Sequence, residues 1–174
     1  MNQLASGCCP QPGSGDWAIV KRQLGREPRA MRSVAHRCRC GLPDVIETSG
    51  RLVDGTPFPT LFYLSCPRAV SAIGTLEASG LMSEMSARLT VDADLSARYR
   101  RAHLSYLARR EAHGHVAEID RISAGGMPTR VKCLHVLVAH SLAAGPGVNP
   151  LGDEALALLP DWWTLGPCVR TADG

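Results

Sequence analysis

The sequence contains no long apolar run. Of its 174 residues 45% are hydrophobic, yet no stretch approaches the roughly 18 apolar residues that a membrane-spanning helix requires. Residues 1–16 also lack the basic start and apolar segment of a secretory signal. We therefore expect a cytoplasmic protein without a membrane span.

A strong excess of charge is also missing. The net charge of +3 is too small to indicate a nucleic-acid-binding protein by itself. One segment combines basic and aromatic residues, as nucleic-acid-binding surfaces do: Arg98, Tyr99, Arg100, Arg101, Tyr106, Arg109 and Arg110. Both tyrosines, however, share a helical face with Leu95 and Ala102, which predicts core positions. We expect the arginines to form a solvated helix face, with a protein partner as the alternative.

The cysteines do not suit a closed disulfide framework, because their number, seven, is odd. Disulfides are also uncommon in the cytosol. Reduced cysteines can serve packing, metal binding or thiol chemistry. We interpret Cys8, Cys9 and Cys168, near the chain ends, as incidental.

Apolar spacing and turn residues predict an α+β fold with a small antiparallel sheet of about three strands covered by several helices. The single domain is expected over 16–165, after a disordered segment 1–15 rich in Gly, Ser and Pro and before a flexible tail 166–174. Helices are predicted over 16–24, from Pro67, from a cap at Asp92 or Asp94, over 131–144 and over 151–159, and strands over 31–37, 45–53 and 56–66. Asp54-Gly55 is the hairpin turn between the last two strands.

This topology brings soft metal ligands to one edge of the sheet. In an antiparallel meander the first and third strands run the same way, so Cys38 and Cys66 end at the same edge. Cys133 and His135 lie where a loop gives way to a helix. We predict a metal site formed by these four residues, holding zinc or an iron–sulfur cluster.

The spacing of these ligands is not a Cys-x-x-Cys signature. Two geometric conditions also limit which residues can share the site. Cys133 and His135 can bind one ion only if Cys133 precedes the first regular turn of its helix, because positions two apart do not share a helical face. His140 lies two turns beyond Cys133, roughly 10 Å along the axis, which is too far for the same ion in a regular helix. Cys40, in the turn after Cys38, is an additional candidate. The sequence contains no nucleotide-cofactor motif.

Two other interpretations remain open. The first is a thiol-dependent enzyme using Cys66 or Cys133, with His135 or His140 as its base. Cys66 precedes Pro67 at a predicted helix N-terminus, where backbone N–H groups stabilise a thiolate. The second is a non-catalytic interaction module, in which the cysteines are core residues.

Several short runs together resemble the bacterial domain-of-unknown-function 501 family. They are His-Arg-Cys at 36–38, Gly-Leu-Pro at 41–43, Phe-Pro-Thr at 58–60, Cys-Pro at 66–67, Lys-Cys-Leu-His at 132–135 and Asn-Pro-Leu-Gly at 149–152. The resemblance covers nearly all of the chain from about residue 16 onward. The family pattern contains Cys38, Cys66, Cys133 and His135, which favours the metal site. Relatives sometimes labelled as related to septum formation imply an association with cell division, and no reaction.

Overall fold

A computed structural model describes residues 13–170 of the chain. The interpretations of Cys8 and Cys9, and most of the predicted disordered segment, lie outside the described residues. Within the described residues, six α-helices, one short 3-10 helix and three strands follow one another in the order α1 (Ser14–Leu24), β1 (Met31–Arg37), β2 (Pro43–Thr48), β3 (Phe62–Leu64), α2 (Pro67–Glu77), α3 (Leu81–Val91), α4 (Ala93–Glu111), η1 (Ala117–Ile119), α5 (Leu134–Ala144) and α6 (Pro150–Ala157). The predicted α+β class is confirmed. No helix within the described residues is both long and apolar enough to cross a membrane.

The sheet is a three-stranded antiparallel meander with β2 in the centre. Arg37 of β1 lies opposite Pro43, and Leu64 of β3 lies opposite Val45. Strands β1 and β3 therefore run in the same direction. Cys38 and Cys66, which follow these strands, leave the sheet at the same edge, as the sequence predicts.

The last two strands are shorter than the predicted segments 45–53 and 56–66, which is a correction. The turn forms at Gly55, whose φ of 86° suits glycine, and Leu52 donates its N–H to Thr56 at 2.9 Å. Beyond the turn, pairing is reduced to a single bridge between Arg51 and Pro57. Pro57 and Pro59 have no N–H group to donate, so the ladder cannot continue through them.

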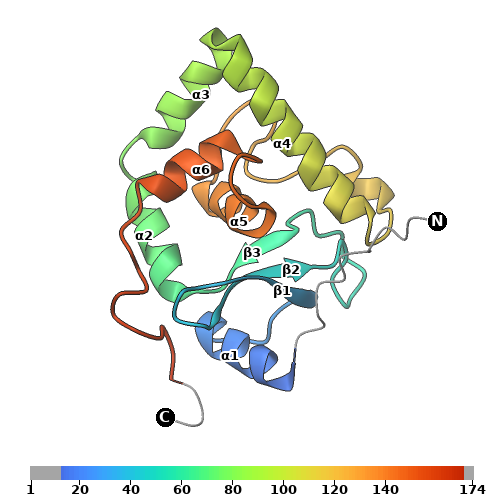
Figure 1. Ribbon diagram of the computed structural model, residues 1–174. Coiled ribbons are helices and arrows are strands. Elements are labelled where there is room, and N and C mark those ends of the chain that lie inside the picture. Colours follow the sequence, from blue (N-terminus) through green and yellow to red (C-terminus); the bar gives the residue numbers. More distant parts are fainter. Residues whose placement is uncertain (1–12, 171–174) are drawn as a thin grey trace, which may run out of the picture.

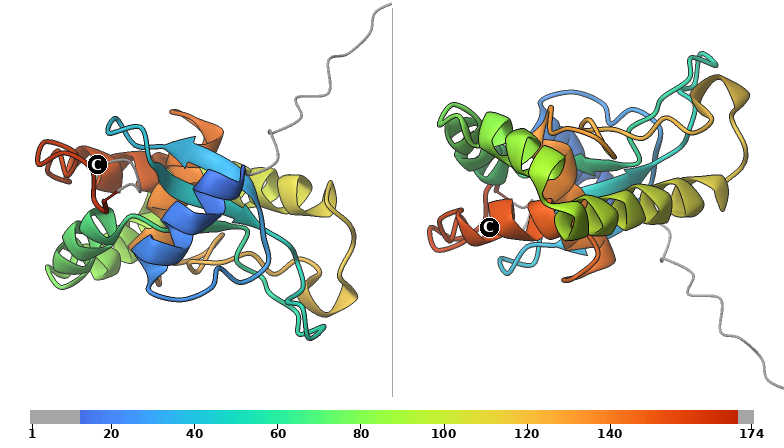
Figure 2. Two further views of the ribbon diagram at one scale, coloured as in Figure 1. Left: turned by 90° about the horizontal axis from the view of Figure 1, so that it is seen from below. Right: turned by 90° about the horizontal axis from the view of Figure 1, so that it is seen from above.

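The helices lie on both faces of the sheet. In Figure 1, α1 lies below the sheet and α5 above it, and α3 and α4 form an inverted V at the top. The two views in Figure 2 agree with this layering. Helix α5 packs against α6, α2 and all three strands. It is therefore the central helix of the core, and its Leu134, Leu137 and Val138 are fully buried.

Helices α5 and α6 approach each other closely at Gly152. A methyl group in place of its hydrogen would overlap the carbonyl oxygen of Leu137 and the hydroxyl of Ser141. Asn149, the N-cap of α6, accepts the Gly152 N–H at 3.1 Å. The position therefore requires a residue without a side chain.

One face of α4 is buried as predicted: Leu95, Tyr99, Ala102 and Tyr106 are all core residues. The expectation of five solvated arginines needs correction. Arg110 is only 2% exposed and donates to the carbonyl oxygens of Ile119 at 2.7 Å and Ile122 at 2.5 Å. Arg109 is also engaged, with the buried Glu47. The basic surface of α4 is smaller than the sequence suggests, because these two arginines bind residues of other segments.

The first turn of α4 offers a local test. The side chain of Asp92 accepts the Leu95 N–H at 2.9 Å, so Asp92→Ala leaves a helix N–H without its capping partner. We expect a loss of about 1 kcal/mol in the free energy of unfolding, measured by urea denaturation. Asp94→Ala is the control, since the Asp94 side chain is 79% exposed and pairs with Arg98 of the same helix. An equal loss in both variants would contradict the capping role.

Candidate metal site

Two of the predicted ligands come together at the start of α5. Cys133 is the N-cap residue of the helix, with extended backbone (φ −156°, ψ 114°), and His135 lies in its first turn. Ligand atoms of Cys133, His135 and Glu77 all lie within 4.8 Å of one another. Cys133 precedes the first regular turn, so the condition set by the spacing is met.

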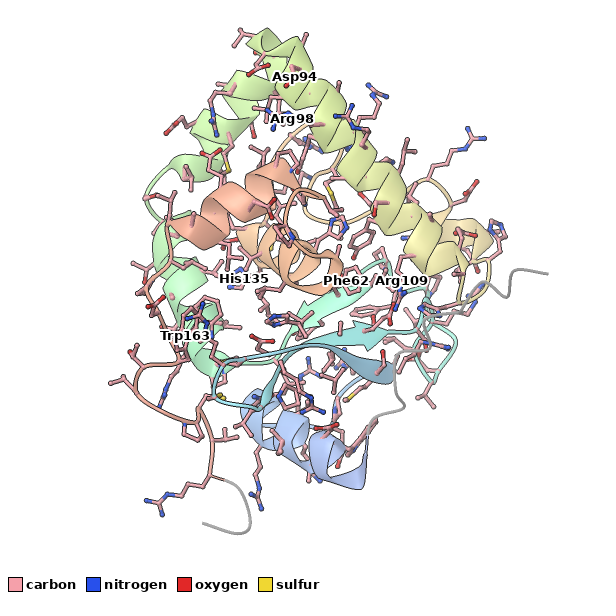
Figure 3. All side chains as sticks on the ribbon, in the orientation of Figure 1. Phe62, Asp94, Arg98, Arg109, His135 and Trp163 are labelled. Atoms are coloured by element: carbon pink, nitrogen blue, oxygen red, sulfur yellow. The ribbon has the colours of Figure 1, made fainter. Side chains whose placement is uncertain are left out.

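Glu77, the last residue of α2, was not among the predicted ligands. Its Oε1 accepts the backbone N–H of Leu134 at 2.6 Å and lies 3.1 Å from Nδ1 of His135. Figure 3 places His135 between α2 and α5. Glu77 thus joins the two helices, and no local sequence signal marks it, because its role depends on their packing.

Both ring nitrogens of His135 face hydrogen-bond acceptors. Nδ1 faces the carboxylate of Glu77, and Nε2 lies 3.2 Å from the carbonyl oxygen of Val70. Neither group can donate to a bare ring nitrogen. The two acceptors therefore suit a positively charged ring, which carries either a second proton or another cation at Nδ1. Cys133 foremost, and then Glu77, raise the pKa of His135 to about 9 against the effect of burial.

The other two predicted ligands lie elsewhere. Within residues 13–170, neither Cys38 nor Cys66 belongs to a group of three such ligand atoms within 4.8 Å. Cys38 contacts Cys40 in the turn after β1, and burial raises the pKa of Cys38 to about 11. Cys66 contacts Cys168. The structure thus brings Cys133 and His135 together, and places each of the other two beside a different thiol.

His140 does not join the group. It is 1% exposed, and Asn149 donates to its Nδ1 at 3.3 Å. Its ring stacks on Phe62 at 5.8 Å and meets Tyr106 edge-on at 5.3 Å. Burial lowers the pKa of His140 to about 4. It is a neutral core histidine in this environment, far along the helix as its spacing predicts.

A family model matches residues 34–157 of the 174, a segment that contains Glu77, Cys133 and His135. The chain belongs to the DUF501 family. The family is described as "Protein of unknown function (DUF501)", so membership confirms the resemblance and implies no reaction. No curated protein matches the chain, and no solved structure does.

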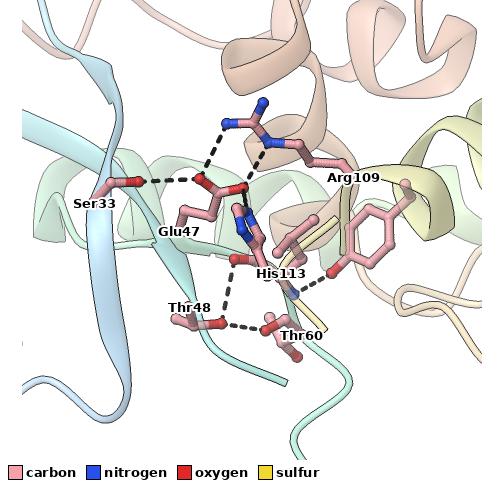
Figure 4. A network of polar contacts seen from close by, with 8 residues as sticks. Ser33, Glu47, Thr48, Thr60, Arg109 and His113 are labelled. Carbon is pink, nitrogen blue, oxygen red and sulfur yellow. Dashed lines mark hydrogen bonds and ion pairs between the residues drawn. The ribbon is translucent and has the colours of Figure 1, made fainter. Parts of the chain in front are cut away.

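The DUF501 chain contains a second polar cluster, centred on the buried Glu47 of β2 (Figure 4). Its Oε1 accepts from Arg109 Nε at 2.7 Å and from His113 Nε2 at 2.8 Å, and its Oε2 accepts from Ser33 at 3.0 Å and from Arg109 at 3.2 Å. Burial raises the pKa of Glu47, but Arg109 and His113 outweigh it, so the pKa is lowered overall.

This cluster connects β2 to α4 rather than presenting a metal ligand. Each carboxylate oxygen of Glu47 already has two donors, and its partners among the described residues include no cysteine. Arg109 also lines a neighbouring cavity of about 320 Å³, together with Phe62, Ser105 and His140. A further group in this DUF501 chain, Glu111, His115 and Asp120, lies mainly at the surface, where acidic groups are common without an ion. Cys133, His135 and Glu77 therefore form the best-supported candidate site.

Proposed function

We propose that this DUF501 protein is a metal-binding protein whose ion, zinc by its donor set, is held by Cys133, His135 and Glu77. The single observation that carries the proposal is the environment of His135. Both of its ring nitrogens face acceptors, and a thiol lies within 4.8 Å. This arrangement suits a positive centre at Nδ1, which a second proton supplies in the free protein and a bound zinc ion would replace.

The distances support a metal ion at this position. Two nitrogen or oxygen ligands at 2.0–2.1 Å from a tetrahedral zinc are about 3.3 Å apart. The Nδ1 of His135 and Oε1 of Glu77 lie 3.1 Å apart, so little movement is needed. The second ring nitrogen then donates to the Val70 carbonyl oxygen, the outer contact typical of a metal-bound histidine.

The donor set favours zinc over an iron–sulfur cluster. One thiolate, one imidazole and one carboxylate suit zinc, whereas a cluster needs mostly thiolates. Three protein ligands leave one tetrahedral position for water or a substrate, and the His135 and Glu77 side chains are 28% and 22% exposed. Zinc bound in such an open site supplies an acidic water or a Lewis acid.

The test is zinc binding by protein that has been stripped with a chelator. We expect about one zinc per chain by elemental analysis after dialysis against zinc. Cys133→Ser and His135→Ala should lose it, and the cobalt-loaded protein should lose its sulfur-to-metal absorption in Cys133→Ser. Glu77→Gln keeps an oxygen for the Leu134 N–H but removes the charge, so its affinity should fall at least about tenfold.

Cys66→Ser is the decisive control, because Cys66 belongs to the four-ligand site predicted from sequence but not to this one. It should bind zinc like the wild type, as should Cys40→Ser. Loss of zinc in Cys66→Ser would restore the four-ligand arrangement and overturn the proposal. The proposal would also be overturned if both Cys133→Ser and His135→Ala retained zinc. A folded wild-type protein that bound no zinc would overturn it as well.

A further inference from the structure

Cys66 and Cys168 form a pair of contacting thiols. Cys66 is the N-cap of α2 and is 1% exposed, whereas Cys168 is half-buried in the segment that follows α6. The two thiols lie close enough for each to shift the pKa of the other. The side-chain amide of Gln23 donates to the Cys168 sulfur at 3.2 Å. Two sulfurs and a fixed donor thus meet between α1 and α2.

The segment that carries Cys168 is held on both sides of it. Arg68 of α2 donates to the carbonyl oxygen of Gly166 at 2.6 Å, and Arg22 of α1 donates to that of Arg170 at 2.8 Å. These contacts keep Cys168 against Cys66. The two thiols are therefore positioned to react with each other without unfolding either helix.

The two thiols have different acidities. The hydrogen bond from Cys66 foremost, with help from Gln23 and Arg68, lowers the pKa of Cys168 to about 6. The same contact and burial raise the pKa of Cys66. Of the two thiols, Cys168 is therefore the one that ionises more readily. The thiolate is the nucleophilic form of cysteine, so Cys168 is the attacking sulfur.

We propose that Cys66 and Cys168 form a peroxide-reactive dithiol site that closes to a disulfide. The Cys168 thiolate attacks one oxygen of hydrogen peroxide, the O–O bond breaks, and hydroxide leaves and takes up a proton to become water. Cys66 then attacks the sulfenic sulfur of Cys168, the S–O bond breaks, and a second water leaves. The two thiols together lose two electrons and two protons, and one peroxide is reduced to two waters.

The test treats reduced, chelator-stripped protein with hydrogen peroxide, followed by alkylation and mass spectrometry. We expect the wild type to lose the mass of two hydrogen atoms and to yield one cross-linked pair of peptides containing residues 66 and 168. Cys66→Ser should stop at a sulfenic acid on Cys168, trapped by dimedone. Cys168→Ser should form no disulfide at Cys66. Cys40→Ser is the matched control, since Cys40 is also half-buried beside another thiol, and should react like the wild type.

The pH dependence separates this site from an ordinary thiol. Because the thiolate fraction falls only below the pKa of Cys168, about 6, the rate at pH 7 should be close to its plateau and should halve near pH 6. An ordinary thiol with a pKa of about 8.5 loses roughly tenfold in rate per pH unit in this range. A Cys38–Cys40 disulfide in place of the expected one, or peroxide consumption unchanged in Cys168→Ser, would overturn the proposal. None of these outcomes depends on whether the protein binds zinc.

Discussion

Replacing Glu47 by alanine is expected to lower the free energy of unfolding by about 3 kcal/mol at neutral pH. Glu47 is 1% exposed and is the common acceptor for Arg109, His113 and Ser33. Its removal leaves the buried Ser33 hydroxyl unpaired and releases the contact between β2 and α4. For a protein of this size the melting temperature should fall by about 6–12 °C.

The stabilisation that Glu47 provides should decrease as the pH falls. Its folded pKa is lowered from 4.5, so its stabilisation is present above the ordinary range of a glutamate and is lost as the pH falls through the folded value. The difference in the free energy of unfolding between wild type and Glu47→Ala should therefore become smaller in acid. Glu118→Ala is the control, because Glu118 pairs with Arg51 at an exposed site, where ion pairs add little. If this difference became larger in acid, the charge of Glu47 would not be the cause of the stabilisation.

Gly152→Ala is expected to destabilise the protein by about 3 kcal/mol, because the added methyl overlaps backbone and hydroxyl atoms of α5. Intrinsic helix propensity acts in the opposite direction and favours alanine by about 1 kcal/mol. The close approach of α6 to α5 must therefore outweigh propensity. Urea denaturation of the two proteins measures the difference.

Gly74→Ala is the matched substitution for this test. Gly74 is also within a helix, α2, but a methyl there meets no atom within 4 Å. The same chemical change should stabilise the protein by about 0.5–1 kcal/mol. If both variants changed stability in the same direction, the packing at Gly152 would not be as tight as described.

The sequence predicts those parts of the fold that depend on local chemistry. Pro67 and Asp92 mark the starts of α2 and α4, and Gly25 ends α1 in a left-handed conformation. The ends of β2 and β3 are less predictable, because the residues around Asp54-Gly55 form a turn whether or not strands continue from it. Pro57 and Pro59, which have no N–H group to donate, limit how far the pairing of β2 and β3 extends.

The candidate site was only partly predictable for a different reason. Cys133 and His135 are close in sequence, so a helix boundary was enough to bring them together. Glu77 and Cys168 act through contacts between distant segments, and no spacing within the chain reveals those. Cys38 and Cys66 do share a sheet edge, but the edge does not determine which neighbour each side chain meets.

The central position of α5 has a consequence for local unfolding. This helix packs against α2, α6 and all three strands, so we expect the amide hydrogens of its central turns to exchange with solvent only when the whole domain opens. Helix α1, which packs mainly against β2, can detach at lower cost. Cys133 and His135 are attached to this helix, and Gln23, which donates to the Cys168 sulfur, to the helix that detaches more readily. The helices that support the two groups should therefore open on different timescales.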